Sequence, residues 1–514
     1  MAIIGGGAAC ISFLFHFVEL HFRRATDTRK ILVFEKERPV GPGLAYQEDH
    51  ADLILNRVAE TMSISPANST LFAKWMVWKA NYSREIHEAT GGSFPDVYLP
   101  RRLFGRFLRD SFREIQNTAA EHGVVIEVIR EAIVRIDRSP ELRVHSRTGS
   151  WAAGNVVLAT GHTNPKDHYG LSGHNRYIHS AYPVSDHLEK LRSASSICIL
   201  GASLTAIDVA VSLQSADYRG RIDMLSRRGL LPYVKGNSYP PHVLQHLTEL
   251  ALKRITDDGI SKVSLRSVLR LLRRELHSVG VSWKMLFANE YPDAKDHLDA
   301  QIESAGEIRP WAPIFRAING LVHDLWNSLD EASQHIFLRR FSRRWMSIRT
   351  PIPIQNAKRL QAMMRTGQLR VSSGPATFSV VPCGRLEMTR QDGSKRHYDA
   401  VVNATGTAAS VDGPPDSELI WSLVQSGIAA ADARGGVKVD FASGALISDT
   451  GAIDRSIRAV GHVTSGTYFY VDSLDMISRQ AQRIAADLME NICGDSHGIA
   501  SQRALEIPDS SLIA

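Results

Sequence analysis

The sequence has few cysteines and no long hydrophobic run. Its four cysteines, Cys10, Cys198, Cys383 and Cys493, are far apart, so the chain has neither a CxxC redox pair nor the paired ligand spacing of a zinc site. No segment contains eighteen consecutive apolar residues, which argues against a membrane-spanning helix. We therefore expect buried thiols in a reducing cytoplasm, with no metal and no membrane association.

Charge of one sign is not concentrated anywhere along the chain. Its 60 Lys and Arg residues exceed its 54 Asp and Glu residues by only 6. This mild basic excess suits anionic cofactors or substrates, and no nucleic-acid-binding motif accompanies it. A hydrophobic content of 44% is ordinary for globular proteins. At 514 residues the chain is long enough for two or three packed units.

The amino terminus, MAIIGGGAAC, combines a short apolar strand, a glycine-rich turn and the start of a helix. Gly5 permits a tight turn, and Gly7, followed by Ala8 and Ala9, lets the backbone approach a pyrophosphate at the helix amino terminus. Cys10 stands where the third glycine of the dinucleotide motif is expected. After the turn, apolar residues recur at helical spacing through Arg24, which favours an amphipathic helix over a signal peptide.

Two further elements complete a first dinucleotide-binding pattern. The strand KILVFEKE ends at Glu35 and Lys36, where an acidic side chain can accept hydrogen bonds from a ribose. Much later, GNVVLATGH gives a buried strand that turns at Thr160 and Gly161. Three elements in this order predict a dinucleotide-binding Rossmann unit.

A second strand, glycine turn and helix follow in SSICILGASLTAIDVAVSL. Gly201 and Ser203 occupy the first two glycine positions, and Leu204 and Thr205 open the helix. One chain with two such units predicts two nucleotides. The next strand ends in a hydroxyl and two guanidiniums that suit a 2′-phosphate, which favours NADPH over NADH. These residues are Ser226, Arg227 and Arg228. A solvated basic turn is the alternative.

The segment Gly201-Ala202-Ser203-Leu204-Thr205 also lies between a strand and a helix, as the nucleophile elbow of α/β-hydrolases does. Ser203 would then be a nucleophile. Two features oppose this interpretation: Thr205 replaces the final glycine, and no HGGG-like oxyanion segment precedes the turn.

Residues 236–372 have helical periodicity and predict an insertion that covers the substrate. Within it, arginines alternate with aromatic residues and could hold a substrate carboxylate or the nicotinamide nucleotide. These substrate-binding candidates are Arg309, Arg316, Arg343, Arg344 and Arg349. Ordinary solvated helix faces explain the same residues equally well.

The end of the chain returns to strand-like sequence. The run through VVPCGRLEMTRQDGSKRHYDAVVNATG predicts strands that rejoin the second sheet, and Thr405 and Gly406 repeat the earlier Ala-Thr-Gly turn. The last strand, SIRAVGHVTSGTYF, leads into a helix near Ser473. We predict an α/β protein with two Rossmann-like domains and a helical insertion. The ranges are 1–190 and 411–514 for the first dinucleotide domain, 191–235 and 373–410 for the NADPH domain, and 236–372 for the insertion.

In the order of its motifs, the chain resembles the two-dinucleotide-domain flavoproteins known as FAD-NAD(P)-binding proteins, over nearly its whole length. The stretches that carry the resemblance are GPGLAYQEDHADLILNRVAETMS, YLPRRLFGRFLRD, LATGHTNP, ILGASLTAIDVAVSL, LSRRGLLP, VVNATG and AVGHVTSGTYF. The resemblance implies that the first dinucleotide domain, residues 1–190 and 411–514, binds FAD. It implies further FAD contacts at Gly43, Leu44, Ala45, Tyr46, Leu55, Asn56, Met62, Ser63, Gly461, Gly466 and Thr467. A long loop over the sheet edge is the alternative for the stretch from Gly43 to Ser63.

The branch that the chain resembles most contains flavin-dependent N-hydroxylating monooxygenases, including enzymes that oxidise aspartate to nitrosuccinate. The resemblance implies a C4a-hydroperoxyflavin, shielded by bound NADP+, that oxygenates a small amino acid or amine with dioxygen. The lack of a cysteine pair disfavours disulfide-reductase chemistry. An NADPH:acceptor reductase, an oxidase and a non-catalytic redox sensor remain open, as does the oligomeric state, with a homodimer among the options.

Overall fold

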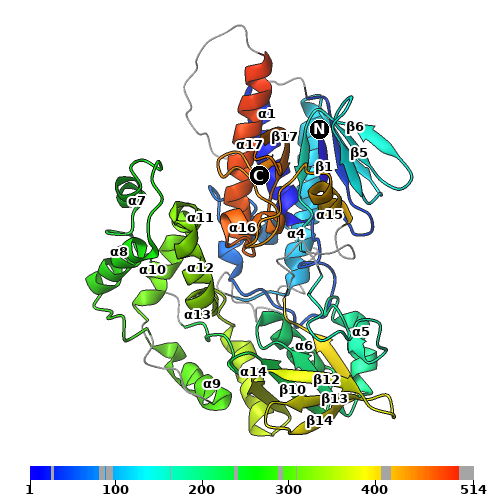
Figure 1. Cartoon of the computed structure of the whole chain (residues 1–514), viewed down its shortest axis with the longest axis vertical. Helices are drawn as coiled ribbons and strands as arrows, with labels where there is room; N and C mark the ends of the chain where they lie inside the picture. The colour runs from blue at the N-terminus through cyan, green and yellow to red at the C-terminus, as the bar shows by residue number, and fades with distance from the viewer. Residues whose placement is uncertain are drawn as a thin grey trace. The chain divides into compact units, whose positions relative to one another are not determined.

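The apolar runs of the sequence form two separate parallel sheets in the computed structural model (Figure 1). The structure describes residues 1–24, 28–79, 87, 97–162, 164–236, 241–286, 293–307, 309–406 and 418–496. The chain divides into two compact units, residues 1–163 with 408–514 and residues 164–407. We describe each unit by itself.

The first unit is built on a sheet with the strand order β16-β17-β7-β1-β2-β3. Its strands are β1 (Ala2–Ile4), β2 (Lys30–Phe34), β3 (Val125–Ile129), β7 (Val156–Leu158), β16 (Ala445–Ile447) and β17 (Ile453–Ala459). Neighbouring strands are parallel except β16 and β17. The carboxyl ends of β2, β1, β7 and β17 therefore lie along one edge, where Rossmann-type sheets bind their ligands.

Two helices from opposite ends of the chain pack side by side in this unit, α1 (Ala8–Arg24) and α17 (Leu474–Ser496) (Figure 1). The apolar face of α1 is buried in a core shared with α17, as its helical spacing predicts. The other helices are η1 (Ala59–Thr61), α2 (Leu71–Trp78), α4 (Arg101–Glu121), α15 (Glu418–Gln425), η5 (His462–Thr464) and α16 (Ser465–Tyr468). A small antiparallel sheet joins β4 (Arg135–Asp137), β5 (Arg143–His145) and β6 (Ser150–Ala152).

The second unit repeats the design with a parallel sheet in the order β11-β10-β9-β15-β8. Its strands are β8 (Tyr177–Ile178), β9 (Ser196–Leu200), β10 (Arg221–Ser226), β11 (Leu369–Ser373) and β15 (Ala400–Asn403). The helix α5 (Ser185–Arg192) precedes β9, and α6 (Leu204–Ser215) follows it. Two parallel sheets, each with a glycine turn before a helix, confirm the predicted α/β fold.

The second unit differs from the sequence analysis in two details. Only β11 and β15 of the return segment join the parallel sheet, because β12 (Ala376–Val380), β13 (Leu386–Arg390) and β14 (Lys395–Tyr398) pair antiparallel as a separate sheet. The hairpin turn at Asp392-Gly393 folds β14 back on β13. In addition, β8 lies before residue 190 but pairs with β15 of the second unit.

Residues between β10 and β11 are mainly helical. The helices are α7 (Glu249–Ile255), α8 (Leu265–Ser278), α9 (Ala294–Glu303), η3 (Ser304–Gly306), α10 (Trp311–Ala317), η4 (Ile318–Leu321), α11 (Val322–Ser328), α12 (Glu331–Arg340), α13 (Ser342–Arg349) and α14 (Ile354–Arg365). Within the described ranges, no helix is both long and apolar enough to cross a bilayer.

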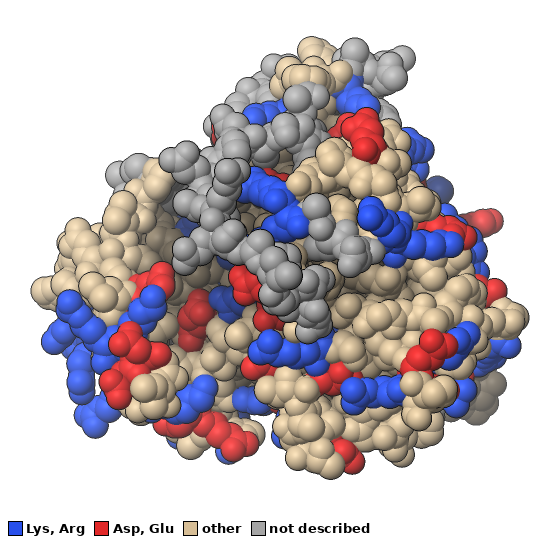
Figure 2. Space-filling model, turned by 90° about the horizontal axis from the view of Figure 1, so that it is seen from above, with Lys and Arg blue, Asp and Glu red and all other residues tan. Residues whose placement is uncertain are grey.

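The surface agrees with the even spread of charge along the sequence. On the face drawn in Figure 2, lysines and arginines alternate with acidic residues and with uncharged surface.

Candidate cofactor sites

The first candidate site lies at the glycine turn between β1 and α1. Gly5 has a φ of +103°, and a β-carbon there would lie 2.2 Å from the Ala159 carbonyl oxygen. At Gly7, in contrast, a β-carbon would meet only the Gly43 Cα, at 3.7 Å. Gly5 is therefore required by the packing of β1 on β7, whereas the space beside Gly7 is open, as a pyrophosphate requires.

Glu35 and the following loop close around this turn. The Gly6 backbone N–H donates to Glu35 Oε2 at 3.0 Å, and the Gly41 N–H donates to the Gly6 carbonyl at 2.7 Å. The predicted residues Gly43, Leu44, Ala45 and Tyr46 follow in the loop. The Tyr46 ring packs on Phe104 of α4, with centroids 4.9 Å apart. Glu35 and the loop thus lie at the same sheet edge, while the predicted Lys36 is exposed and pairs with Glu37.

Other predicted FAD residues lie beneath the turn. Leu55 and Met62 belong to the core that contains Ala9 and Cys10. The Ser63 hydroxyl donates to the Asn68 carbonyl at 2.5 Å, and Asn56 is half-buried. The buried Cys10 shows that a thiol fits where the motif has its third glycine. Leu55, Met62 and Ser63 therefore shape the loop, and their contact with a flavin remains a prediction.

The carboxyl end of β17 reaches the same turn. Gly461 has a φ of +83°, and its β-carbon would lie 3.5 Å from the Ala9 Cβ. The Gly461 N–H donates to Gln480 Oε1 of α17 at 2.8 Å, and Gln480 Nε2 donates to Thr464 Oγ1 at 2.8 Å. A buried glutamine thus fixes the Gly461 turn against the first turn of α1. Gly466 is buried against Asp432, and Thr467 follows it in α16.

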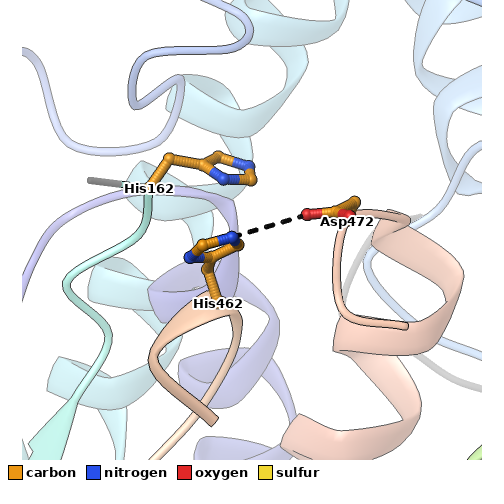
Figure 3. Close-up of side chains that lie close together, drawn as sticks. All are labelled: His162, His462 and Asp472. Atoms are coloured by element: carbon orange, nitrogen blue, oxygen red, sulfur yellow. Dashed lines mark ion pairs between the residues drawn. The ribbon is translucent and has the colours of Figure 1, made fainter. Parts of the chain in front are cut away.

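The structure also assembles a cluster that the sequence analysis did not identify: His162, His462 and Asp472 (Figure 3). The two imidazole centroids lie 4.6 Å apart, and His462 Nε2 lies 3.8 Å from Asp472 Oδ1. Burial, and secondly the neighbouring His162, lower the pKa of His462 to about 4, although Asp472 opposes the shift. His462 is therefore neutral at neutral pH. The two histidines are 300 positions apart, but each follows a glycine at the end of a strand.

The second candidate site repeats the geometry of the first at the turn between β9 and α6. Gly201 has a φ of +123°, and a β-carbon there would lie 2.4 Å from the Ala404 carbonyl oxygen. Thr405 and Gly406 follow Ala404 and are exposed. The Thr405 hydroxyl and N–H both donate to Asn403 Oδ1. Gly201 and Ala404 thus correspond to Gly5 and Ala159.

Ser203 shows no feature of a nucleophile. It begins α6 as its N-cap with a φ of −102°, an ordinary conformation that does not match the strained turn of a hydrolase elbow. Its side chain is exposed, next to Leu204 and Thr205. This conformation leaves the backbone N–H groups at the start of α6 as the feature able to bind an anion.

The basic residues after β10 are brought near a third arginine. Arg227 and Arg228 are exposed, and Ser226 Oγ accepts the Gly229 N–H at 3.0 Å, which closes the turn that carries them. The pKa of Arg343 on α13 is lowered, by partial burial and then by the positive charges of Arg227 and Arg228. An anion bound beside these three arginines would reduce the repulsion among their positive charges. A phosphate suits this position because guanidiniums pair well with phosphate oxygens.

Three of the other arginines proposed for substrate binding donate hydrogen bonds to residues of the second unit. Arg309 donates to the Val234 carbonyl at 2.6 Å, Arg344 donates to Tyr233 Oη at 3.2 Å, and Arg349 donates to the Phe315 carbonyl at 2.7 Å. Arg316 is exposed on α10. Arg309 and Arg344 thus hold the segment after β10, and Arg349 of α13 holds α10, while a role of the five arginines in substrate binding remains a prediction.

Comparison with known proteins agrees with this geometry. A family model described as FAD-NAD(P)-binding matches residues 2–163. Reduced ornithine hydroxylase from Pseudomonas aeruginosa has a similar structure, with a TM-score of 0.60 and 15% identity over 96% of this chain and 98% of the other. L-lysine 6-monooxygenase from Pseudomonas syringae is also similar, with a TM-score of 0.57 and 17% identity over 96% of this chain and 99% of the other.

A third similar structure is the ornithine N-hydroxylase of Kutzneria sp. 744, solved with reduced FAD, NADP+ and L-ornithine. Its TM-score is 0.51 and its identity 14%, over 96% of this chain and 99% of the other. The search of curated proteins found no match. Residues 2–163 thus match the FAD-NAD(P)-binding family model, and the chain shares its overall fold with these ornithine and lysine hydroxylases.

Proposed function

We propose that this protein is an FAD-dependent monooxygenase that uses NADPH and dioxygen to hydroxylate the nitrogen of a small amino acid or amine. The observation that carries the proposal is the repeated glycine turn. Gly5 against Ala159 and Gly201 against Ala404 form two equivalent anion-binding turns at the ends of parallel strands. One turn holds FAD and the other holds NADPH.

The residues at the first turn fit FAD. The open space beside Gly7 and the amino terminus of α1 would hold the pyrophosphate. The Glu35 carboxylate, at the end of β2, would accept hydrogen bonds from the ribose. When bound, FAD supplies the transfer of electrons from NADPH to oxygen, and this chain contributes orientation and the exclusion of water.

The residues at the second turn favour NADPH over NADH. Arg227 and Arg228 would pair with the 2′-phosphate, and Arg343 would join them from α13. This reassigns Arg343 from substrate to cofactor. Of the original substrate candidates, Arg316 remains exposed and suitable for a carboxylate.

The substrate class follows from the similar structures, which act on ornithine and on lysine. The test is NADPH consumption in air with a panel of amines, each with and without a carboxylate. We expect one or more amino acids to increase NADPH consumption and to give a product heavier by one oxygen. Equal activity on amines without an acid group would remove the assigned role of Arg316.

Two alternative functions predict different results in the same assay. A reductase or oxidase consumes NADPH and converts the oxygen to peroxide in equal amount with every amine. A redox sensor is reduced once and then stops. Sustained, amine-dependent NADPH consumption with an oxygenated product excludes both alternatives.

A further inference from the structure

The cluster of His162, His462 and Asp472 lies at the edge of the sheet that the first glycine turn also occupies. His162 follows Gly161 beyond the end of β7, and His462 follows Gly461 beyond the end of β17. These strands are parallel neighbours, and β7 also pairs with β1, which leads into the glycine turn. Three consecutive strands therefore bring both histidines and the turn to one edge.

Gly461 also packs against α1, which places the segment after β17 beside the first glycine turn. A β-carbon at Gly461 would lie 3.5 Å from the Ala9 Cβ, in the first turn of α1. Among the described residues, no atom lies within 4 Å of the position of a β-carbon at Gly161. The amino terminus of α1 and the two segments that carry the histidines therefore share one edge of the sheet, where a dianion would bind.

The charges around the pair indicate which ligand they suit. His462 faces His162 from the end of β7 and Asp472 from the loop before α17. The first turn of α1 has no acidic residue, and Gln480 of α17 is neutral. Before a ligand binds, burial and the neighbouring imidazole hold His462 neutral. The two negative charges of a pyrophosphate beside the pair would outweigh the effects of burial and of the neighbouring imidazole, and would favour protonation of the pair.

We infer that His162 and His462 form a proton-binding pair within the FAD site that takes up a proton when the pyrophosphate of FAD binds. This inference rests on the proposed function, since it requires FAD at the first turn. The affinity for FAD then depends on pH: it is highest in acid and falls as the pH rises, because the bound state holds a proton that the free state lacks. His462 and His162 thus position the cofactor through charge as well as shape.

The test measures FAD binding to the full-length protein after removal of its flavin. Titration calorimetry in buffers of different ionisation enthalpy gives the number of protons taken up, and repeating it between about pH 5.5 and 8 gives the pH dependence. We expect the wild type to take up as much as one proton per FAD, and its Kd to increase by up to about tenfold per pH unit.

The variants His162→Asn, His462→Asn and the double variant remove the titrating groups but keep hydrogen-bonding side chains. The double variant should bind FAD with a Kd that changes little with pH and should take up no proton. His335→Asn, which changes an exposed histidine on α12, is the matched control and should behave as the wild type.

Three results separate the possible failures. A protein that binds no FAD at any pH contradicts the proposed function itself. Tight FAD binding without proton uptake in the wild type, or with unchanged uptake in the double variant, contradicts only the histidine inference. One-to-one binding of Co²⁺ to the flavin-free protein that His462→Asn abolishes, combined with FAD binding that takes up no proton, would show a metal site and overturn our inference.

Discussion

Individual residues at the two glycine turns have distinct roles that substitution can separate. Gly5 is required by packing, because its β-carbon would overlap the Ala159 carbonyl and its φ is positive. Gly7 has room for a β-carbon in the protein itself, and a larger side chain there would enter the space that we assign to the pyrophosphate. Substitution of Gly5 should therefore impair folding, whereas substitution of Gly7 should impair cofactor binding.

Gly7→Val should give a folded protein that lacks FAD, whereas Gly5→Ala should destabilise the fold by at least about 1–3 kcal/mol because of backbone strain. Flavin absorbance per protein and the thermal midpoint Tm measure the two effects. Full flavin occupancy in Gly7→Val would refute the assignment of the first turn to FAD.

Arg227→Ala with Arg228→Ala should reduce the preference for NADPH over NADH, and adding Arg343→Ala should reduce it further. Each charge-assisted phosphate contact contributes on the order of 1–3 kcal/mol, so each loss should change the ratio of kcat/KM by about 5- to 150-fold. Arg340→Ala, an exposed arginine on α12, serves as the control. An unchanged ratio in the triple variant would place the 2′-phosphate elsewhere.

At the scale of elements, single buried polar side chains hold loops to helices. Gln480 of α17 accepts the Gly461 N–H and donates to Thr464. Gln480→Leu should leave the buried Gly461 N–H without its acceptor and leave the Thr464 hydroxyl only its bond to the Gly461 carbonyl. This should destabilise the protein by about 1–3 kcal/mol and weaken FAD binding. Urea unfolding and FAD titration measure these effects. Unchanged FAD affinity would mean that the Gly461 turn does not contact the cofactor.

Helix α8 holds the segment before α7 through one carboxylate. Glu275 is fully buried, pairs with His242 Nε2 at 2.8 Å and accepts the backbone N–H groups of residues 245–247. These hydrogen bonds lower the pKa of Glu275 to about 2 despite its burial. Because the folded pKa lies below the unfolded value, this stabilisation is present above about pH 4.5 and is lost as the pH falls towards 2.

Glu275→Gln should therefore lower the free energy of unfolding by about 2–3 kcal/mol near neutral pH. The difference from the wild type should shrink as the pH falls from about 4.5 towards 2, because the carboxylate of the unfolded chain becomes protonated in this range while that of the folded protein stays ionised until about pH 2. Glu303→Gln, at an exposed position of α9, is the control. A pH-independent difference, measured by urea unfolding, would show that the charge of Glu275 is not responsible.

For the whole molecule, the sequence was most informative where local geometry determines the residue. Gly5 and Gly201 are recognisable because only glycine permits that turn beside the next strand, and the spacing of Ile11 and Leu14 predicts the buried face of α1. These features repeat in the chain, so both Rossmann units could be predicted.

Contacts between distant residues could not be predicted. Arg309 and Arg349, which we predict as substrate-binding candidates, donate hydrogen bonds to the carbonyls of Val234 and Phe315 among others, and no side-chain pattern reveals these contacts. His162 and His462 meet only because β7 and β17 are neighbours in the sheet. Their repeated position after a Gly at a strand end was the one signal that could have suggested it.

The central claim for the whole molecule is that oxygen from dioxygen is transferred to the nitrogen of a substrate. The most direct test supplies the purified, FAD-loaded protein with NADPH, an amine that stimulates NADPH consumption, and ¹⁸O-labelled dioxygen, followed by mass spectrometry of the product. Our account predicts a hydroxylated nitrogen that carries ¹⁸O, in an amount that follows the NADPH consumed. NADPH consumption that yields only labelled peroxide, with every amine unchanged, would contradict it.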